Sequence, residues 1–246
     1  MKNLPATLVA LFLVFLCIPV QADYSPWTFF GGVNFIYNSD GSDVTEVPGM
    51  QEGGVPGGLD SAPSPITGLI GLEYRREIRE RVFFSPSISL FFVEYLWAND
   101  QALPAEIENR TAFVPSLLLD ASFVYTIERN RFLFSIGGGP GILLRWAFLD
   151  SGVSEDEQSY STDMSAGDQV DHINSYMWSS LRWFYPMLHA GVRYRLETGW
   201  GGGLTLRTGI PLFNLWSSPD VPFPHALMFI ACITITPPLR SGQKGR

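Results

Sequence analysis

The feature of this sequence that most restricts its fold is an alternation of apolar and polar residues with a period of two, repeated in eight separate segments. A period of two places successive side chains on opposite faces of a β-strand. In segment 82–95, for example, Ile88 and Leu90 alternate with Ser87 and Ser89. The eight expected strands are residues 26–37, 65–76, 82–95, 111–126, 131–148, 176–196, 200–213 and 226–236.

The two faces of these strands differ in the size of their side chains. One face bears large aliphatic and aromatic groups, and the other is rich in Gly, Ser and Thr. A soluble β-sandwich or a lipocalin-like barrel also alternates, but it would turn its large residues inward and carry charges outside. Small polar residues suit a narrow, crowded lumen, and a large apolar face suits lipid. The pattern therefore favours a membrane barrel over a soluble β fold.

The connections between the expected strands alternate between long and short. The long connections are 38–64, 96–110, 149–175 and 214–225, and the short ones are 77–81, 127–130 and 197–199. Both ends of the chain fall on the side of the short connections. This is the layout of an outer-membrane barrel with an even number of strands. The sequence therefore predicts an all-β fold, an eight-stranded antiparallel transmembrane β-barrel with long acidic external loops and short periplasmic turns.

Charge follows the same division of the connections. Sixteen of the 24 acidic residues lie in the four long connections, where Arg110 is the only basic residue. The basic residues cluster at the opposite end: Arg75, Arg76, Arg79, Arg81, Arg129, Arg131, Arg193 and Arg195. A soluble sandwich gives no reason for this separation. We expect tags at Gly54, Asn99 and Gly167 to be accessible on intact cells and a tag at Asn130 to be inaccessible.

The first 22 residues have the pattern of a cleaved signal peptide. Lys2 gives a positive start, residues 8–18 are an unbroken apolar run, and small residues lead to Ala22. The run is too short to span a bilayer as a helix, which takes about 20 residues. The expected division is a signal peptide over 1–22, an outer-membrane barrel over 23–239 and a basic tail over 240–246. Cys232 is then the only cysteine, so an internal disulfide is excluded.

Composition and motifs argue against several other functions. The net charge of −8 leaves no basic face for nucleic acid. A lipid-modifying hydrolase would need a Ser activated by a His that a carboxylate orients. None of His172, His189 and His225 forms a His-x-Ser pair, so we predict no enzyme and no cofactor.

A run of acidic residues in the third long connection raises the question of calcium. The residues are Asp150, Glu155, Asp156, Glu157, Asp163, Asp168 and Asp171. They lack the spacing and the glycine of a calcium-binding hand. We expect a solvated acidic surface and no metal site.

One stretch of the chain carries a local motif. A strand containing Pro115 runs to Tyr125, and after a short turn a second strand starts at Arg131 and enters the glycine-rich run Gly137 to Gly141. This stretch resembles eight-stranded outer-membrane barrels of the OmpA, OmpX and OmpW types, and it is most similar to the OmpW type. Such barrels end in an aromatic residue that serves as an assembly signal, whereas here residues 236–239 read Thr-Pro-Pro-Leu.

The resemblance implies a small integral outer-membrane protein with a narrow path for small solutes, hydrophobic ones among them. The alternative is a non-conducting barrel that displays its loops for adhesion or host contact. A polar plug in the lumen would favour display, and an open side wall or an apolar throat would favour passage. The implied partners are outer-membrane lipid, the barrel assembly machinery and a small solute or host ligand, with the protein as a monomer.

If the small polar face of each strand lines the lumen, several charged residues on that face project into the lumen. An eight-stranded barrel has an interior just filled by side chains, so opposite charges there should pair. We expect Glu73 and Asp120 to pair with Arg193 and Arg207. This network either replaces a hydrophobic core or gates a conduit, with Asp120 and Arg207 as the constriction. The full set of lumen and gate candidates is Glu73, Asp120, Arg131, Arg145, His189, Arg193 and Arg207.

Overall fold

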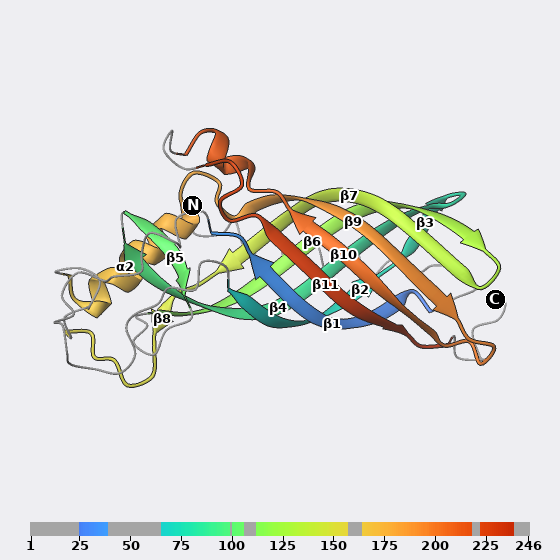
Figure 1. Ribbon diagram of the computed structural model, residues 1–246, viewed down its shortest axis with the longest axis horizontal. Helices are drawn as coiled ribbons and strands as arrows, with labels where there is room; N and C mark the ends of the chain where they lie inside the picture. The colour runs from blue at the N-terminus through green and yellow to red at the C-terminus, as the bar shows by residue number, and fades with distance from the viewer. Residues whose placement is uncertain are drawn as a thin grey trace.

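The computed structural model is an elongated β-barrel that carries a helix at one end (Figure 1). It describes residues 25–38, 65–98, 100–105, 112–156, 164–217 and 222–238. The predicted signal peptide 1–22 and basic tail 240–246 lie outside these ranges, as do most of the acidic residues of the long loops. Within the described ranges, no helix combines the length and the apolar character needed to cross a bilayer.

Eight long antiparallel strands make up the barrel wall in the described residues, which confirms the predicted fold class. Their bounds are β1 Trp27–Ile36, β2 Ile66–Tyr74, β4 Val82–Ala98, β6 Ala112–Arg129, β7 Phe132–Arg145, β9 Phe184–Arg195, β10 Gly201–Gly209 and β11 Met228–Thr236. Three short strands are added to these: β3 Arg76–Arg79, β5 Gln101–Ala105 and β8 Phe148–Leu149. Each long strand pairs with its sequence neighbours, and β1 pairs with β11, so that the sheet closes on itself.

The strand register sets the tilt and width of the barrel. Following paired residues around the wall from Ser116 on β6 leads back to the same strand at Thr126, ten residues away. The intermediate residues are Phe91, Leu69, Gly32, Cys232, Thr205, Gly191 and Ser135. With strands about 4.8 Å apart and about 3.3 Å per residue, this stagger corresponds to a strand tilt of about 40°. A barrel of this size has room inside for side chains and little else.

The two ends of the barrel differ. At one end, called here the turn end, adjacent strands are joined by short turns at 80–81, 130–131 and 196–200. Arg81 and Asn130 adopt positive φ values of 65° and 57° in the first two turns. The opposite end, called here the helix end, carries α2 (Ala166–Trp178) and the 3-10 helix η1 (Leu212–Leu215). The expected division into tight turns and long connections is therefore present.

The strand predicted over 176–196 is wrong in its first third. Residues up to Trp178 belong to α2, and β9 begins only at Phe184. Ser165 caps the helix by accepting a hydrogen bond from the Asp168 backbone N–H at 3.1 Å. Val170, Ile173 and Met177 recur at spacings of three and four, so they face one way and pack into the core.

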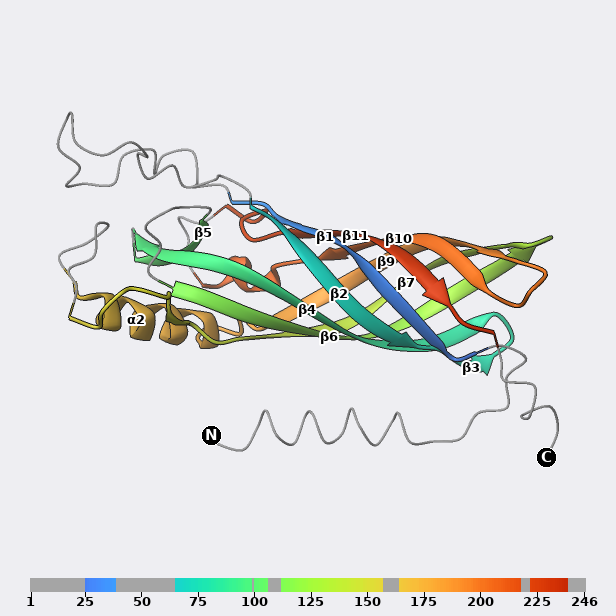
Figure 2. The same ribbon diagram turned by 90° about the horizontal axis from the view of Figure 1, so that it is seen from below.

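The longest strands continue beyond the barrel wall at the helix end. β4 pairs with β5, and β6 pairs with β8, so that a small extension of the sheet stands above the barrel mouth. α2 lies along this extension (Figure 2). The ring of Trp97 on β4 lies 5.2 Å from that of His172 and 5.9 Å from that of Tyr176. The described parts of the long connections 96–110 and 149–175 therefore include a strand and a helix.

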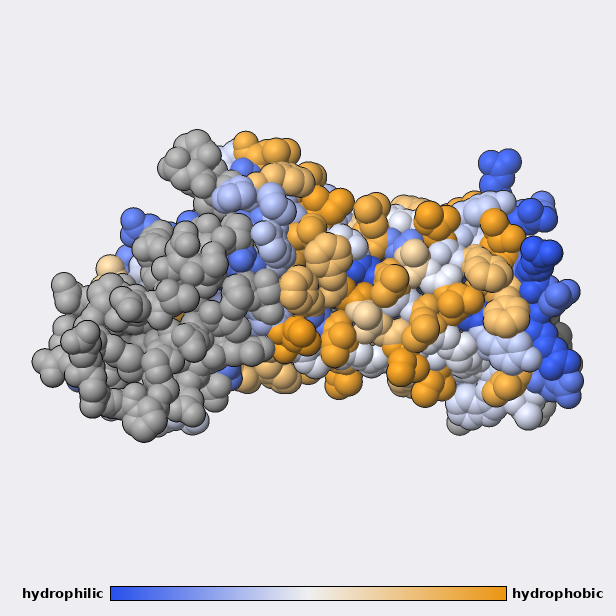
Figure 3. Space-filling view, viewed as in Figure 1, coloured by the Kyte–Doolittle hydropathy of each residue, from blue (hydrophilic) through white to orange (hydrophobic). Residues whose placement is uncertain are grey.

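The outer face of the barrel wall is apolar. Figure 3 shows apolar residues over the middle of the barrel and hydrophilic residues at the turn end. Exposed apolar residues include Ile70, Ile136, Leu188, Leu204, Leu206 and Ile233. Aromatic rings flank this band, with Tyr125 and Phe132 toward the turn end and Phe113, Trp146 and Trp178 toward the helix end.

The spacing of the two aromatic groups matches a bilayer. Tyr125 follows Phe113 by twelve residues on β6. At about 3.3 Å per residue and a tilt of about 40°, these positions are roughly 30 Å apart along the barrel axis. Membrane-spanning barrels carry an apolar band about 25 Å tall between two aromatic girdles. The exterior is therefore that of a membrane-spanning barrel.

The lumen has a polar part and an apolar part. Polar side chains fill its middle and its turn end, and an apolar layer lies between them and the helix end. This mainly apolar layer consists of Leu69, Phe91, Leu118, Met187 and Ile230, all buried, with one buried polar residue, Asn34, paired in register with Ile230. Phe91 interrupts the alternation of apolar and polar residues in β4. It is apolar but points inward, whereas serine occupies the three preceding inward positions, 85, 87 and 89.

Candidate functional site

A charge network in the lumen is centred on Glu73 of β2, which is only 1% exposed. Its Oε1 accepts hydrogen bonds from Arg75 Nε at 2.7 Å and from Arg193 Nη2 at 2.6 Å. Its Oε2 accepts one from Arg207 Nη2 at 2.8 Å. Charge-assisted hydrogen bonds of this length are about twice as strong as neutral ones. One carboxylate thus ties β2 to β9 and β10 through the interior of the barrel.

Arg207 extends the network to the other side of the lumen. Its Nη1 donates to Ser87 Oγ of β4 at 2.6 Å and lies 3.7 Å from Asp120 Oδ2 of β6. Ser122 Oγ donates to Asp120 Oδ1 at 2.6 Å. Arg193 Nη1 also donates to Thr28 Oγ1 of β1 at 3.2 Å. Side chains from six of the eight long strands therefore meet in one network.

The local sequence explains how the Arg207 guanidinium is held. Its Cζ lies 4.4 Å from the centre of the Phe30 ring, which is a cation–π contact. A Cβ atom at Gly71 would lie 2.3 Å from Phe30 Cζ, so glycine leaves the space that this ring occupies. The buried ring then supports the guanidinium from one side, while Glu73 and Ser87 bind its nitrogens.

The structure brings together most of the predicted lumen residues. Glu73, Asp120, Arg193 and Arg207 lie in the network, with the pairing expected from the sequence. His189 is buried on β9 next to them, paired in register with Arg207.

Two predicted residues lie elsewhere, and one network member was missed. The expectation that Arg131 projects into the lumen is wrong, because its half-exposed side chain pairs with Glu197 at the turn end. Arg145 is buried in the lumen at the helix end, apart from the network. Arg75 was not among the candidates, although its position two residues after Glu73 puts both side chains on the same face.

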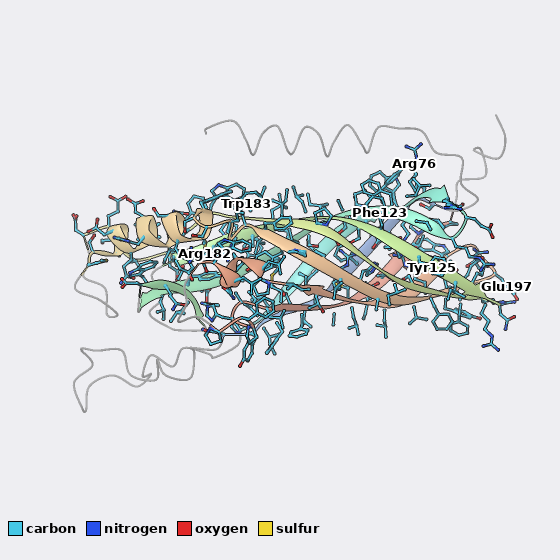
Figure 4. All side chains as sticks on the ribbon, turned by 90° about the horizontal axis from the view of Figure 1, so that it is seen from above. Arg76, Phe123, Tyr125, Arg182, Trp183 and Glu197 are labelled. Carbon is cyan, nitrogen blue, oxygen red and sulfur yellow. The ribbon has the colours of Figure 1, made fainter. Side chains whose placement is uncertain are left out.

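A small cleft opens at the helix end. Two arginines line it, Arg145 of β7 and Arg182 of the segment between α2 and β9. Tyr95, Tyr176 and Tyr185 also line it, and the remaining lining residues include Ile36, Leu143, Phe213 and Met228. Figure 4 shows Arg182 toward the helix end and Arg76 and Glu197 at the opposite end. Burial raises the pKa of Tyr176, so this phenol stays neutral at neutral pH.

The described residues include no group of three or more His, Cys, Asp or Glu side chains placed to hold a metal ion. Of the acidic residues considered for calcium, Glu157 and Asp163 lie outside the described ranges. The absence of a metal site therefore stays a prediction.

Neither a family model nor a curated protein matches the chain. Among solved structures, it is similar to the outer membrane protein OprG from Pseudomonas aeruginosa, with 11% identity and a TM-score of 0.46, over 90% of this chain and 100% of that one. It is also similar to Neisserial surface protein A, with 8% identity and a TM-score of 0.41, over 85% and 95% of the two chains. The outer membrane enzyme PagL matches with 10% identity and a TM-score of 0.35, over 85% and 99%. Because a barrel fold is shared by enzymes and other proteins, these similarities leave the activity of this chain open.

Proposed function

We propose that this protein is an integral outer-membrane barrel with a closed lumen that acts at its outer, helix-bearing end. The proposal rests on one observation, the bridging of the lumen by Glu73 through Arg193 and Arg207. A side chain that is 1% exposed and bound by three arginines packs closely against its neighbours, which supports a closed lumen. A polar plug in the lumen favours surface display over passage of solutes, so this arrangement supports a surface protein rather than a channel.

The location and orientation follow from the exterior of the barrel. An apolar band between two aromatic girdles requires lipid around it, and in outer-membrane barrels the short turns face the periplasm. The turn end, with the exposed Arg131 and Glu197, is then periplasmic. The helix end, with α2 and the cleft, faces the outside. The outer surface is therefore where this protein meets solutes or other cells.

A narrow conduit is the second candidate, and the apolar layer favours it. Leu69, Phe91, Leu118, Met187 and Ile230 form an apolar throat between the cleft and the charge network. A small apolar solute could enter this throat from the cleft. It would still have to displace the network to pass, because Arg207 and Asp120 lie across the lumen below it.

Planar-bilayer recordings of the refolded full chain test the choice between these functions. We expect near-zero conductance for the wild type, for Asp120→Ala, for Arg207→Ala and for the double variant, with lower thermal stability in the variants. Arg131→Ala, which removes an arginine outside the lumen, should match the wild type in both measurements. Stepwise conductance in the wild type, or raised conductance in either single lumen variant, would establish the conduit instead.

A further inference from the structure

The two arginines of the cleft have no acidic partner among the described residues. Arg145 Nη1 donates to the Tyr95 hydroxyl at 3.3 Å, and its Nη2 donates to the Arg182 carbonyl at 2.9 Å. Arg182 Nη1 donates to Ser179 Oγ at 2.6 Å, and its Cζ lies 3.8 Å from the centre of the Tyr176 ring. All of these partners are neutral. This distinguishes the cleft from the lumen network, where each arginine contacts a carboxylate.

Both arginines are also buried, with exposures of 8% for Arg145 and 7% for Arg182. The Nε atom of each is buried without a hydrogen-bond partner in the described structure. A buried guanidinium that lacks a counter-charge is costly, and its unused donors add to that cost. Two such groups lining one open cleft create a strong local preference for an anion.

The other residues that line the cleft favour an anion with an apolar body. Ile36, Leu143, Phe213, Ala226 and Met228 line it with apolar surface, and the rings of Tyr95 and Tyr185 add more. In its composition, apolar with a few convergent polar groups, this lining resembles that of small-molecule sites. An inorganic ion would leave this apolar lining unused, and an uncharged hydrocarbon would leave the arginines without a partner.

We propose that the cleft binds a small amphipathic carboxylate, with its carboxylate on Arg145 and Arg182 and its apolar body along Ile36, Leu143 and Phe213. A planar carboxylate matches the fork of guanidinium donors. This inference goes beyond the proposed function, because it holds whether or not the lumen conducts. It assigns the outer end of the barrel a ligand class.

Calorimetric titration of the refolded full chain in zwitterionic lipid nanodiscs tests the proposal, with empty nanodiscs as the blank. The probes are hexanoate, hexanol and inorganic phosphate. We expect hexanoate to bind at one site per chain, and hexanol and phosphate to bind at least tenfold more weakly. Equal binding of hexanoate and hexanol would show simple apolar partitioning, and equal binding of phosphate would remove the role of the apolar body. Either result, or no binding of hexanoate, overturns the proposal.

Variants locate the site. Arg145→Gln and Arg182→Gln should each weaken hexanoate binding at least tenfold, since each removes charge-assisted hydrogen bonds to the ligand. Arg131→Gln is the matched control at the turn end and should bind as the wild type does. Undiminished binding in both cleft variants would refute the assignment. Heat-modifiable mobility on a gel verifies that each variant has folded.

A second measurement uses the wild type alone, so it does not depend on the folding of any variant. A hexanoate analogue bearing a diazirine at its apolar end is irradiated with the protein, and the labelled peptides are identified by mass spectrometry. We expect labels on segments that contribute Ile36, Leu143 or Phe213 to the cleft. Labels confined to the outer barrel wall would overturn the proposal. Neither measurement records conductance, so failure here and failure of the closed-lumen function remain distinguishable.

Discussion

Replacing Glu73 with glutamine removes one negative charge from the centre of the lumen network and changes little else in shape. The side chain is 1% exposed and accepts from three guanidinium groups at 2.6 to 2.8 Å. The amide can still accept through its oxygen, but its NH₂ group faces arginines that only donate. Asp120 is then the one carboxyl group left in the network, and it lies 3.7 Å from Arg207, so that Arg75 and Arg193 lose their carboxylate partner.

The expected cost follows from breaking a buried ion pair by removing one partner. Such changes lower the free energy of unfolding by about 3–5 kcal/mol, because an uncompensated buried charge remains. Glu197→Gln is the matched control, since Glu197 also pairs with an arginine, Arg131, but at the exposed turn end. Exposed pairs of this kind contribute about 0–1 kcal/mol.

The assay is equilibrium urea unfolding of the refolded protein in lipid vesicles, followed by tryptophan fluorescence and by heat-modifiable mobility. The difference between Glu73→Gln and Glu197→Gln is the informative quantity. A loss below about 1 kcal/mol for Glu73→Gln, or equal losses for the two variants, would refute the view that this network stabilises the barrel.

Three further predictions concern the wall and the orientation of the barrel. Ile70→Arg, on the outer face near mid-barrel, should lower the free energy of unfolding in urea by about 2–4 kcal/mol. Ile78→Arg, beyond the girdle, should lower it by only about 0–1 kcal/mol, and equal costs would contradict the position of the lipid band. Gly139→Val should lower the free energy of unfolding by about 3 kcal/mol or more, or prevent refolding, because a Cβ there would lie 2.2 Å from the Ala121 carbonyl oxygen. The control Gly68→Val, with nothing within 4 Å of its Cβ, should refold normally. With Cys232 buried as the only native thiol of the described chain, an impermeant maleimide should label Ser151→Cys on intact cells and Asn130→Cys only after permeabilisation; equal labelling would reverse the orientation.

The strands could be predicted because lipid on one side and a packed lumen on the other impose a strict period of two. The prediction failed at residues 176–178, where Tyr176 and Met177 belong to an amphipathic helix that packs on the sheet extension, and at residues 212–213, which belong to η1. A helix with one buried side and a strand end both place apolar residues near polar ones over such a short stretch. The Ser165 cap, with Asp168 three residues on, was the local signal for the helix.

The charge network could be predicted in its pairing but not in its full membership. The inward position of these residues and their opposite charges were sufficient to predict that Glu73 and Asp120 pair with Arg193 and Arg207. Arg131 was misplaced because alternation continues into a turn, where a side chain is no longer held inside the wall. The cleft arginine Arg182 was missed because its contacts depend on the path of the chain between α2 and β9, which no periodicity describes.

The closure of the wall by β1 and β11 bears on how this barrel can form in a membrane. Glu73 receives its partner Arg193 from 120 residues further along the chain and Arg207 from 134 residues further. A half-built sheet would therefore enter the bilayer with its network incomplete, and a buried ion left without a partner costs several kcal/mol. In the first hairpin Glu73 has only Arg75 as a local partner, and it gains Arg193 and Arg207 only when the late strands arrive. We therefore expect completion of the network to couple the late strands to the early ones during assembly.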